Sequence, residues 1–71
     1  MPLTMVTAGK TVRLVGVRAG HELLGRLAAL GLVPGVEIEV VNHSLRGPFI
    51  VSVKGSRVML GRGMAHKIMV E

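Results

Sequence analysis

Residues 26–35 read Arg-Leu-Ala-Ala-Leu-Gly-Leu-Val-Pro-Gly, and this stretch decides the fold. It has the form of the last turns of an amphipathic helix, a glycine that ends the helix, and a Pro-Gly turn. Alternation follows at once, with apolar side chains at Val36, Ile38 and Val40 and a glutamate after each of the first two. Such alternation is typical of a strand with one buried face. The stretch therefore predicts one helix within a chain of strands.

The same alternation continues on both sides of this stretch and predicts a mainly β chain. The expected strands are residues 10–17, 36–43, 49–54, 57–60 and 66–70. The expected helix covers residues 21–30, and residues 1–9 lead into the domain. Five strands close most economically into a small barrel. We therefore expect a single domain over residues 1–71, a small five-stranded barrel with one short amphipathic helix inserted after the first strand.

The connections and the core can also be predicted. The expected connections are a bulge near Gly16, a loop over residues 42–48, a type II′ turn at Gly55-Ser56 and, at residues 61–65, a tight turn or a single helical turn. The expected core is Val12, Leu14, Val36, Ile38, Val40, Phe49, Val51, Val53, Val58, Leu60, Ile68 and Val70, with Leu23, Leu27 and Leu30 from the helix. Leu3 and Val6 could also pack onto the domain. Gly25 inside the helix costs roughly 1 kcal/mol relative to alanine, which predicts the close approach of another element.

Composition limits the classes of partner. The net charge is +5, from nine Lys and Arg against four acidic residues, and such a charge is typical of nucleic-acid binding. The basic residues are scattered, however, and Phe49 is the single aromatic residue, whereas base stacking needs several. We therefore do not favour nucleic acid. No apolar run approaches the ~18 residues of a membrane span, so we expect no membrane insertion, and residues 1–10 do not read as a signal peptide.

Few residues could perform catalysis or bind metal. The chain has no cysteine, and none of its serines (Ser44, Ser52 and Ser56) is followed by a recognisable base and orienting group. The three histidines (His21, His43 and His66) lack metal-ligand spacing, so we expect them to be solvated. Gly61-Arg62-Gly63 lacks the Walker pattern and reads as a turn. We expect no enzyme activity, no catalytic, cofactor-binding or metal-binding residue, and no cofactor.

Apolar residues that do not fit the core predict a docking surface. The outward phase of the later strands contains Val41, Ile50, Met59 and Met69, and Met64 precedes the last strand. Methionine is flexible and polarizable, and it adapts to partner surfaces. We expect these residues to bind another protein or a second copy of the chain. The alternative is that the N-terminal segment covers them.

Two linked motifs resemble the FeoA family. Residues 26–35 match Arg-Leu-x-x-Leu-Gly-Leu-x-Pro-Gly, and residues 60–70 match Leu-Gly-Arg-x-x-Ala-x-x-Ile-x-Val. Gly9 and Gly47-Pro48 also fit the family pattern, so the resemblance covers nearly the whole chain. It implies an SH3-like barrel and a small cytoplasmic accessory protein of bacterial ferrous iron transport.

The resemblance also implies a partner. This partner is FeoB, a membrane transporter with a cytoplasmic GTP-binding domain, whose GTPase activity or assembly the protein would modulate. Arg26 and Arg62 belong to the two motifs. Each would either bind a nearby carbonyl or glutamate of this chain or face the partner. The alternatives are a stand-alone basic barrel that binds nucleic acid and a regulatory domain like the C-terminal domain of metal-dependent repressors.

Overall fold

The computed structural model describes residues 1–43 and 46–71. Part of the predicted loop over residues 42–48, with Ser44, lies outside the described residues. The elements follow the predicted order, with two short helices added. They are η1 (Leu3–Met5), β1 (Thr11–Val17), α1 (His21–Ala29), β2 (Glu37–His43), β3 (Phe49–Val53), β4 (Ser56–Leu60), α2 (Arg62–Lys67) and β5 (Ile68–Val70).

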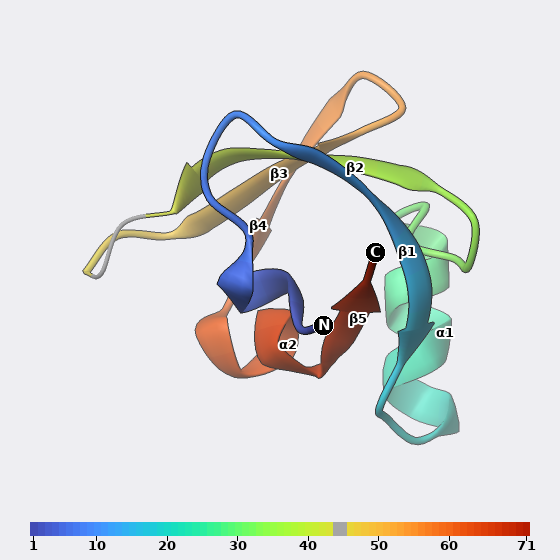
Figure 1. The fold of residues 1–71 in the computed structure, drawn as a ribbon. Coiled ribbons are helices and arrows are strands. Elements are labelled where there is room, and N and C mark those ends of the chain that lie inside the picture. Colours follow the sequence, from blue (N-terminus) through green and yellow to red (C-terminus); the bar gives the residue numbers. More distant parts are fainter. Residues whose placement is uncertain (44–45) are drawn as a thin grey trace.

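The five strands form one antiparallel sheet in the order β4-β3-β2-β1-β5. The first half of β1 pairs with β2 and the second half pairs with β5, so β1 arches across the molecule (Figure 1). The register of β1 against β5 shifts between Leu14 and Gly16, where the sequence predicts a bulge. The expected mainly β fold, with five strands and a helix after the first of them, is confirmed.

Helix α2 connects β4 and β5, which are the two ends of the sheet, and packs against η1. Its first part is the helical turn that the sequence allows at residues 61–65, and its last two residues replace the start of the predicted strand at residues 66–70. Ala65 on α2 and Leu3 on η1 are both fully buried. The helical turn buries Ala65 and exposes His66, whereas the alternation that places Ile68 and Val70 inward would bury position 66. The expected packing of Leu3 and Val6 onto the domain is confirmed.

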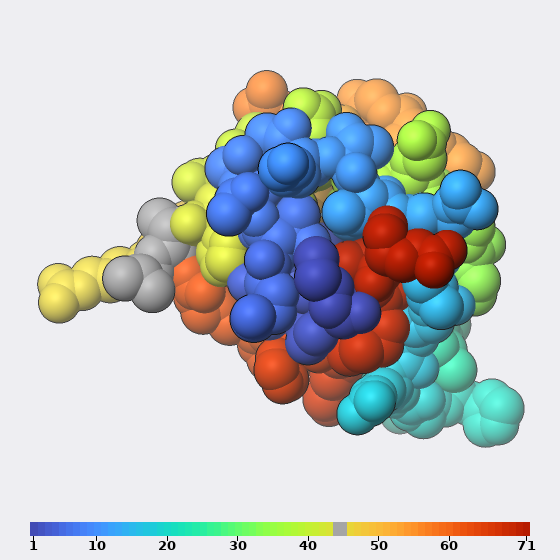
Figure 2. Space-filling model, in the orientation of Figure 1, coloured from blue at the N-terminus to red at the C-terminus, as the bar shows by residue number. Residues whose placement is uncertain are grey.

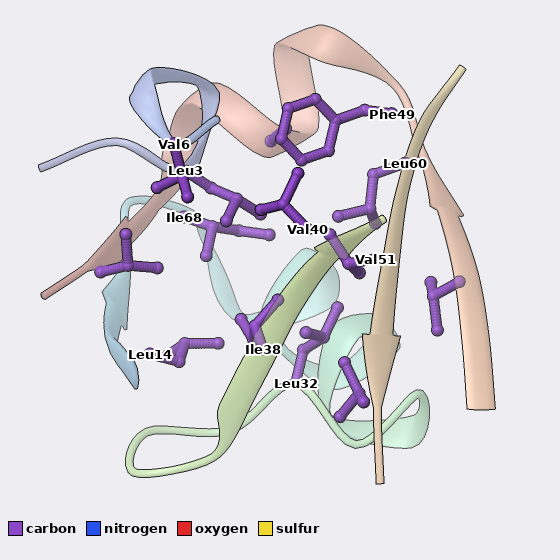
Figure 3. Packing of buried hydrophobic residues seen from close by; sticks show 14 of the residues in the cluster. Leu3, Val6, Leu14, Leu32, Ile38, Val40, Phe49, Val51, Leu60 and Ile68 are labelled. Atoms are coloured by element: carbon purple, nitrogen blue, oxygen red, sulfur yellow. The ribbon is translucent and has the colours of Figure 1, made fainter. Parts of the chain in front are cut away.

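The buried residues form one cluster between the sheet, α1, η1 and α2 (Figure 3). The predicted inward strand residues belong to it, except that Val12 is half-buried, and Leu23 of the helix is half-buried too. The prediction for Leu30 is wrong, since this side chain is 50% exposed, while Leu32 is buried in its place.

The end of α1 explains this exchange. The amide of Gly31 donates to the Ala28 carbonyl (2.9 Å), and the amide of Leu32 donates to the Leu27 carbonyl (2.9 Å). With Gly31 at φ +88°, this is a Schellman motif, which brings the residue after the glycine against the last apolar turn of the helix. Leu32 and Leu27 therefore both enter the core. The following Pro-Gly turn is confirmed by a Val36 amide to Val33 carbonyl bond of 3.1 Å.

The β3–β4 hairpin turns one residue earlier than predicted. The turn residues are Lys54 and Gly55, with φ of 51° and 81°, and Val53 pairs with Ser56. Two positive φ values define a type I′ turn, whose twist matches that of the strands. The predicted type II′ turn at Gly55-Ser56 is therefore wrong. Ser56 becomes the first residue of β4.

Gly25→Ala is expected to stabilise the protein by roughly 0.5–1 kcal/mol, because alanine restricts the unfolded chain and favours the helix. A β-carbon built at Gly25 has no neighbour within 4 Å among the described residues, so the predicted close approach at this glycine is wrong within the chain. Thermal and urea unfolding followed by circular dichroism would measure the change.

Gly31→Ala at the other end of the same helix is the matched control. Gly31 has φ +88°, which an L side chain rarely adopts, and the added β-carbon would lie 3.5 Å from Val53 Cγ1. This variant should therefore lose stability. A loss of stability in Gly25→Ala would contradict the open environment at that position.

Candidate functional site

Three of the predicted docking residues come together on the outer side of the sheet. Ile50 of β3 lies directly opposite Met59 of β4, and Val41 lies in a second bulge, where the register of β2 against β3 shifts between Val40 and Asn42. Met59 is 69% exposed, while Ile50 and Val41 are half-buried. We call Val41, Ile50 and Met59 the outer patch. It presents an adaptable apolar side chain near the end of the sheet.

The structure separates the other two apolar residues from this patch. Met69 lies on β5, at the other end of the sheet, where Pro2 forms an isolated bridge to it. Met64 lies on α2 and packs against the core, and both methionines are half-buried. The N-terminal segment therefore reaches the backbone of Met69 through Pro2, while Met59 remains exposed.

Arg26 lies on the exposed side of α1. Its Nη2 is 3.2 Å from Glu22 Oε1, one helical turn earlier, and the two side chains are 73% and 86% exposed. An exposed pair at this spacing contributes about 0.3–0.5 kcal/mol, so it holds the side chain weakly. The guanidinium remains accessible to a partner.

Arg62 points inward and forms a cluster with His43, Phe49 and the N-terminal segment. His43 Nδ1 donates to the Val6 carbonyl (3.0 Å), because a carbonyl oxygen can only accept, and Arg62 Nη1 lies 3.4 Å from the remaining ring nitrogen, Nε2. The Phe49 ring lies 4.6 Å from the His43 ring, centroid to centroid. Arg62 Nη2 is buried with no hydrogen-bond partner in the described structure. The cluster joins α2, β2 and the segment after η1.

The prediction that His43 is solvated is wrong, because this ring is half-buried and bonded at both nitrogens. Its partners are 37 and 19 residues away, so no local spacing could have revealed them. His66 is exposed and shares a 3.2 Å hydrogen bond with Thr4 Oγ1, and His21 is exposed at the start of α1. Within residues 1–43 and 46–71, no three His, Cys, Asp or Glu side chains come together as metal ligands.

An open groove beside β1 is a feature that the sequence analysis did not predict. It has a volume of about 270 Å³ and is lined by Met1, Met5, Val6, Thr7, Lys10 and Val12. The N-terminal segment crosses this face next to the C-terminal residues (Figure 2). Val12 lines the groove, which explains why it is half-buried. None of the predicted docking residues lines it. No helix in the described part of the chain is long and apolar enough to cross a membrane.

Comparison with known protein families and with known sequences points to one family. The family model described as FeoA domain matches residues 1–71. A Methanocaldococcus jannaschii protein described as a Fe(2+) transport protein A is 39% identical over 70 residues, which are 99% of this chain and 84% of that protein.

Solved structures extend this likeness to the fold. The crystal structure of an iron uptake regulatory protein (FeoA) has a TM-score of 0.91 and 36% identity, covering 99% of this chain and 93% of that one. Stenotrophomonas maltophilia FeoA complexed with zinc, described as an SH3 domain protein, has a TM-score of 0.84 and 26% identity, covering 100% and 89%. The crystal structure of T. acidophilum IdeR has a TM-score of 0.85 and 27% identity, covering 99% of this chain and 32% of that one. The expected SH3-like barrel is confirmed.

Proposed function

The chain belongs to the FeoA family, and on this premise we propose that it is an accessory protein of ferrous iron transport that binds the FeoB membrane transporter. The contact would be made with the cytoplasmic GTP-binding domain of FeoB, so the protein would work in the cytoplasm and modulate the GTPase activity or assembly of the transporter. It would act by protein–protein contact and not as an enzyme.

The outer patch is the observation that carries this proposal. Met59 is 69% exposed on a strand, directly opposite Ile50, so most of this large apolar side chain is in contact with solvent. Exposed apolar groups beside a half-buried one are typical of contact surfaces that a partner covers. Arg26 on α1 is exposed as well, and it would make a separate polar contact with the partner.

Met59→Glu is expected to weaken binding to the purified cytoplasmic domain of FeoB by about tenfold, because it places a charge where an apolar contact forms. Calorimetry at ~0.3 M salt would measure the affinity and limit contributions from nonspecific charge attraction. Met5→Glu is the matched control, since Met5 is also 69% exposed but lies on η1. Its affinity should change less than about twofold.

The net charge of +5 favours one other function, which is nucleic-acid binding. Contacts to phosphates weaken steeply with salt, so the same titrations with duplex DNA and single-stranded RNA at two salt concentrations separate the two functions. If the protein fails to bind FeoB but retains nucleic acid at ~0.3 M salt, the proposed function is wrong. If Met59→Glu binds FeoB like the wild type, the outer patch is not the contact.

A further inference from the structure

Strand β4 has one unpaired edge among the described residues. It lies at the end of the sheet, and its register partners all belong to β3 (Figure 1). The type I′ turn closes with the Ser56 amide opposite the Val53 carbonyl, so Ser56 directs its backbone groups toward β3. In an antiparallel ladder the hydrogen-bonded positions alternate. Arg57 and Met59 therefore direct their backbone N–H and C=O groups toward the free edge.

The side chains of these two residues are also free. Arg57 and Met59 are exposed, whereas Val58 and Leu60 between and beyond them are buried in the barrel. No carboxylate pairs with Arg57 among the described residues. Across the sheet, Arg57 lies opposite Ser52, and Ser52 lies opposite Glu39. Two strand spacings separate the Cα atoms of Glu39 and Arg57 by about 10 Å, and no ion pair joins their side chains in the described part of the chain.

We propose that this edge binds an extended acidic segment of a partner protein, which adds a strand antiparallel to β4. The partner segment would place an apolar residue opposite Met59 and, two residues later in its own sequence, an Asp or Glu opposite Arg57. The free backbone groups of Arg57 and Met59 would bond to those same two residues. The carboxylate would neutralise Arg57, and the apolar side chain would cover Met59.

Charge complementarity favours this occupant over a second copy of the chain. Each copy has a net charge of +5, so two copies repel, while an acidic segment is attracted. An antiparallel pair of β4 strands centred on Val58 would place Arg57 of each copy opposite Met59 of the other. That arrangement provides the backbone bonds but leaves both arginines without a carboxylate. The inference rests on the proposed function in taking the partner to be a protein.

The test uses a synthetic peptide, so it can fail independently of FeoB binding. The probe is acetyl-Thr-Thr-Thr-Val-Thr-Glu-Thr-amide, titrated into the ¹⁵N-labelled full chain at low salt. We expect the Arg57 and Met59 amides to shift together and to exchange more slowly with solvent. N-methylation of the peptide Glu amide should weaken binding by about tenfold or more, because it removes one bond to β4. N-methylation of the preceding Thr amide, which faces away, should change it less than about twofold.

The second part of the test exchanges the charges of the peptide Glu and of Arg57, which leaves the strand backbone unchanged. Replacing the peptide Glu by Lys should weaken binding by about threefold to tenfold, and Arg57→Glu should restore it for the Lys peptide. Met59→Pro removes the outward amide and should abolish binding, provided that its circular dichroism spectrum remains native. Equal binding of the two N-methylated peptides would overturn the proposal. A dimer through β4 that the peptide does not dissociate would also overturn it.

Discussion

Leu27→Ala should lower the free energy of unfolding by about 2–5 kcal/mol. Leu27 is 1% exposed. The structure describes every residue of α1, and Leu27 is the one that is buried. Its carbonyl also accepts the Leu32 amide that closes the Schellman motif, so the cavity would open where two core residues meet. A chain of this length has roughly 4–10 kcal/mol of stability, so this loss would remove a large fraction of it.

Leu30→Ala tests whether this effect comes from burial. Both variants replace a leucine by alanine, and Leu30 directly follows the last residue of α1. The Leu30 side chain, however, is 50% exposed. The loss should stay within about 0.5 kcal/mol. Urea unfolding of both variants, followed by circular dichroism, gives the comparison. If the two variants melt together, α1 is not anchored by Leu27 and the description of the core is wrong.

Phe49→Ala should cost about 3–5 kcal/mol, the largest single loss that we expect. Phe49 is fully buried and has the largest of the fully buried side chains. In the sheet it pairs with His43 of β2 on one side and with Leu60 of β4 on the other. Removing the ring also removes the contact with the His43 imidazole, 4.6 Å away between centroids. Calorimetric unfolding would measure the loss.

A histidine signal would separate the local consequence from global unfolding. In the folded fraction of Phe49→Ala, the His43 ring resonances should move toward those of a solvated imidazole, while those of exposed His66 should stay in place. Phe49→Leu keeps most of the volume and should lose less stability than Phe49→Ala. An unfolding free energy within about 1 kcal/mol of the wild type for Phe49→Ala would contradict the central position of this ring.

The barrel could be predicted because most of its determinants are local. Alternation at Val36, Ile38 and Val40 places them inward, and all three are buried. The burial of Leu32 could have been predicted from the sequence too, since a glycine C-cap followed by an apolar residue is typical of a Schellman motif. The alternation also extends to residues 66 and 67, where it fails, because these residues belong to α2, which buries Ala65 and packs against η1.

The candidate site was predictable only in part. The outward phase of β3 and β4 identifies Ile50 and Met59 from periodicity alone, and the register places them opposite each other. Arg62 could not be assigned from its motif, since its contact is His43, on an element that meets α2 only through the tertiary fold. The backbone groups of Arg57 face the free edge only because the hairpin turn lies at Lys54-Gly55, one residue earlier than predicted. The alternation of side chains does not reveal this position of the turn.

Met1 and Val70 lie side by side and exchange two hydrogen bonds. The Met1 ammonium donates to the Val70 carbonyl (2.8 Å), and the Val70 amide donates back to the Met1 carbonyl (2.7 Å). During translation, these two hydrogen bonds therefore cannot form until residue 70 has left the ribosomal exit tunnel. Synthesis proceeds at about 5–20 residues per second, so for several seconds the nascent chain exposes apolar strands without their closing partner. Chaperone capture of this protein should fall sharply once β5 is released.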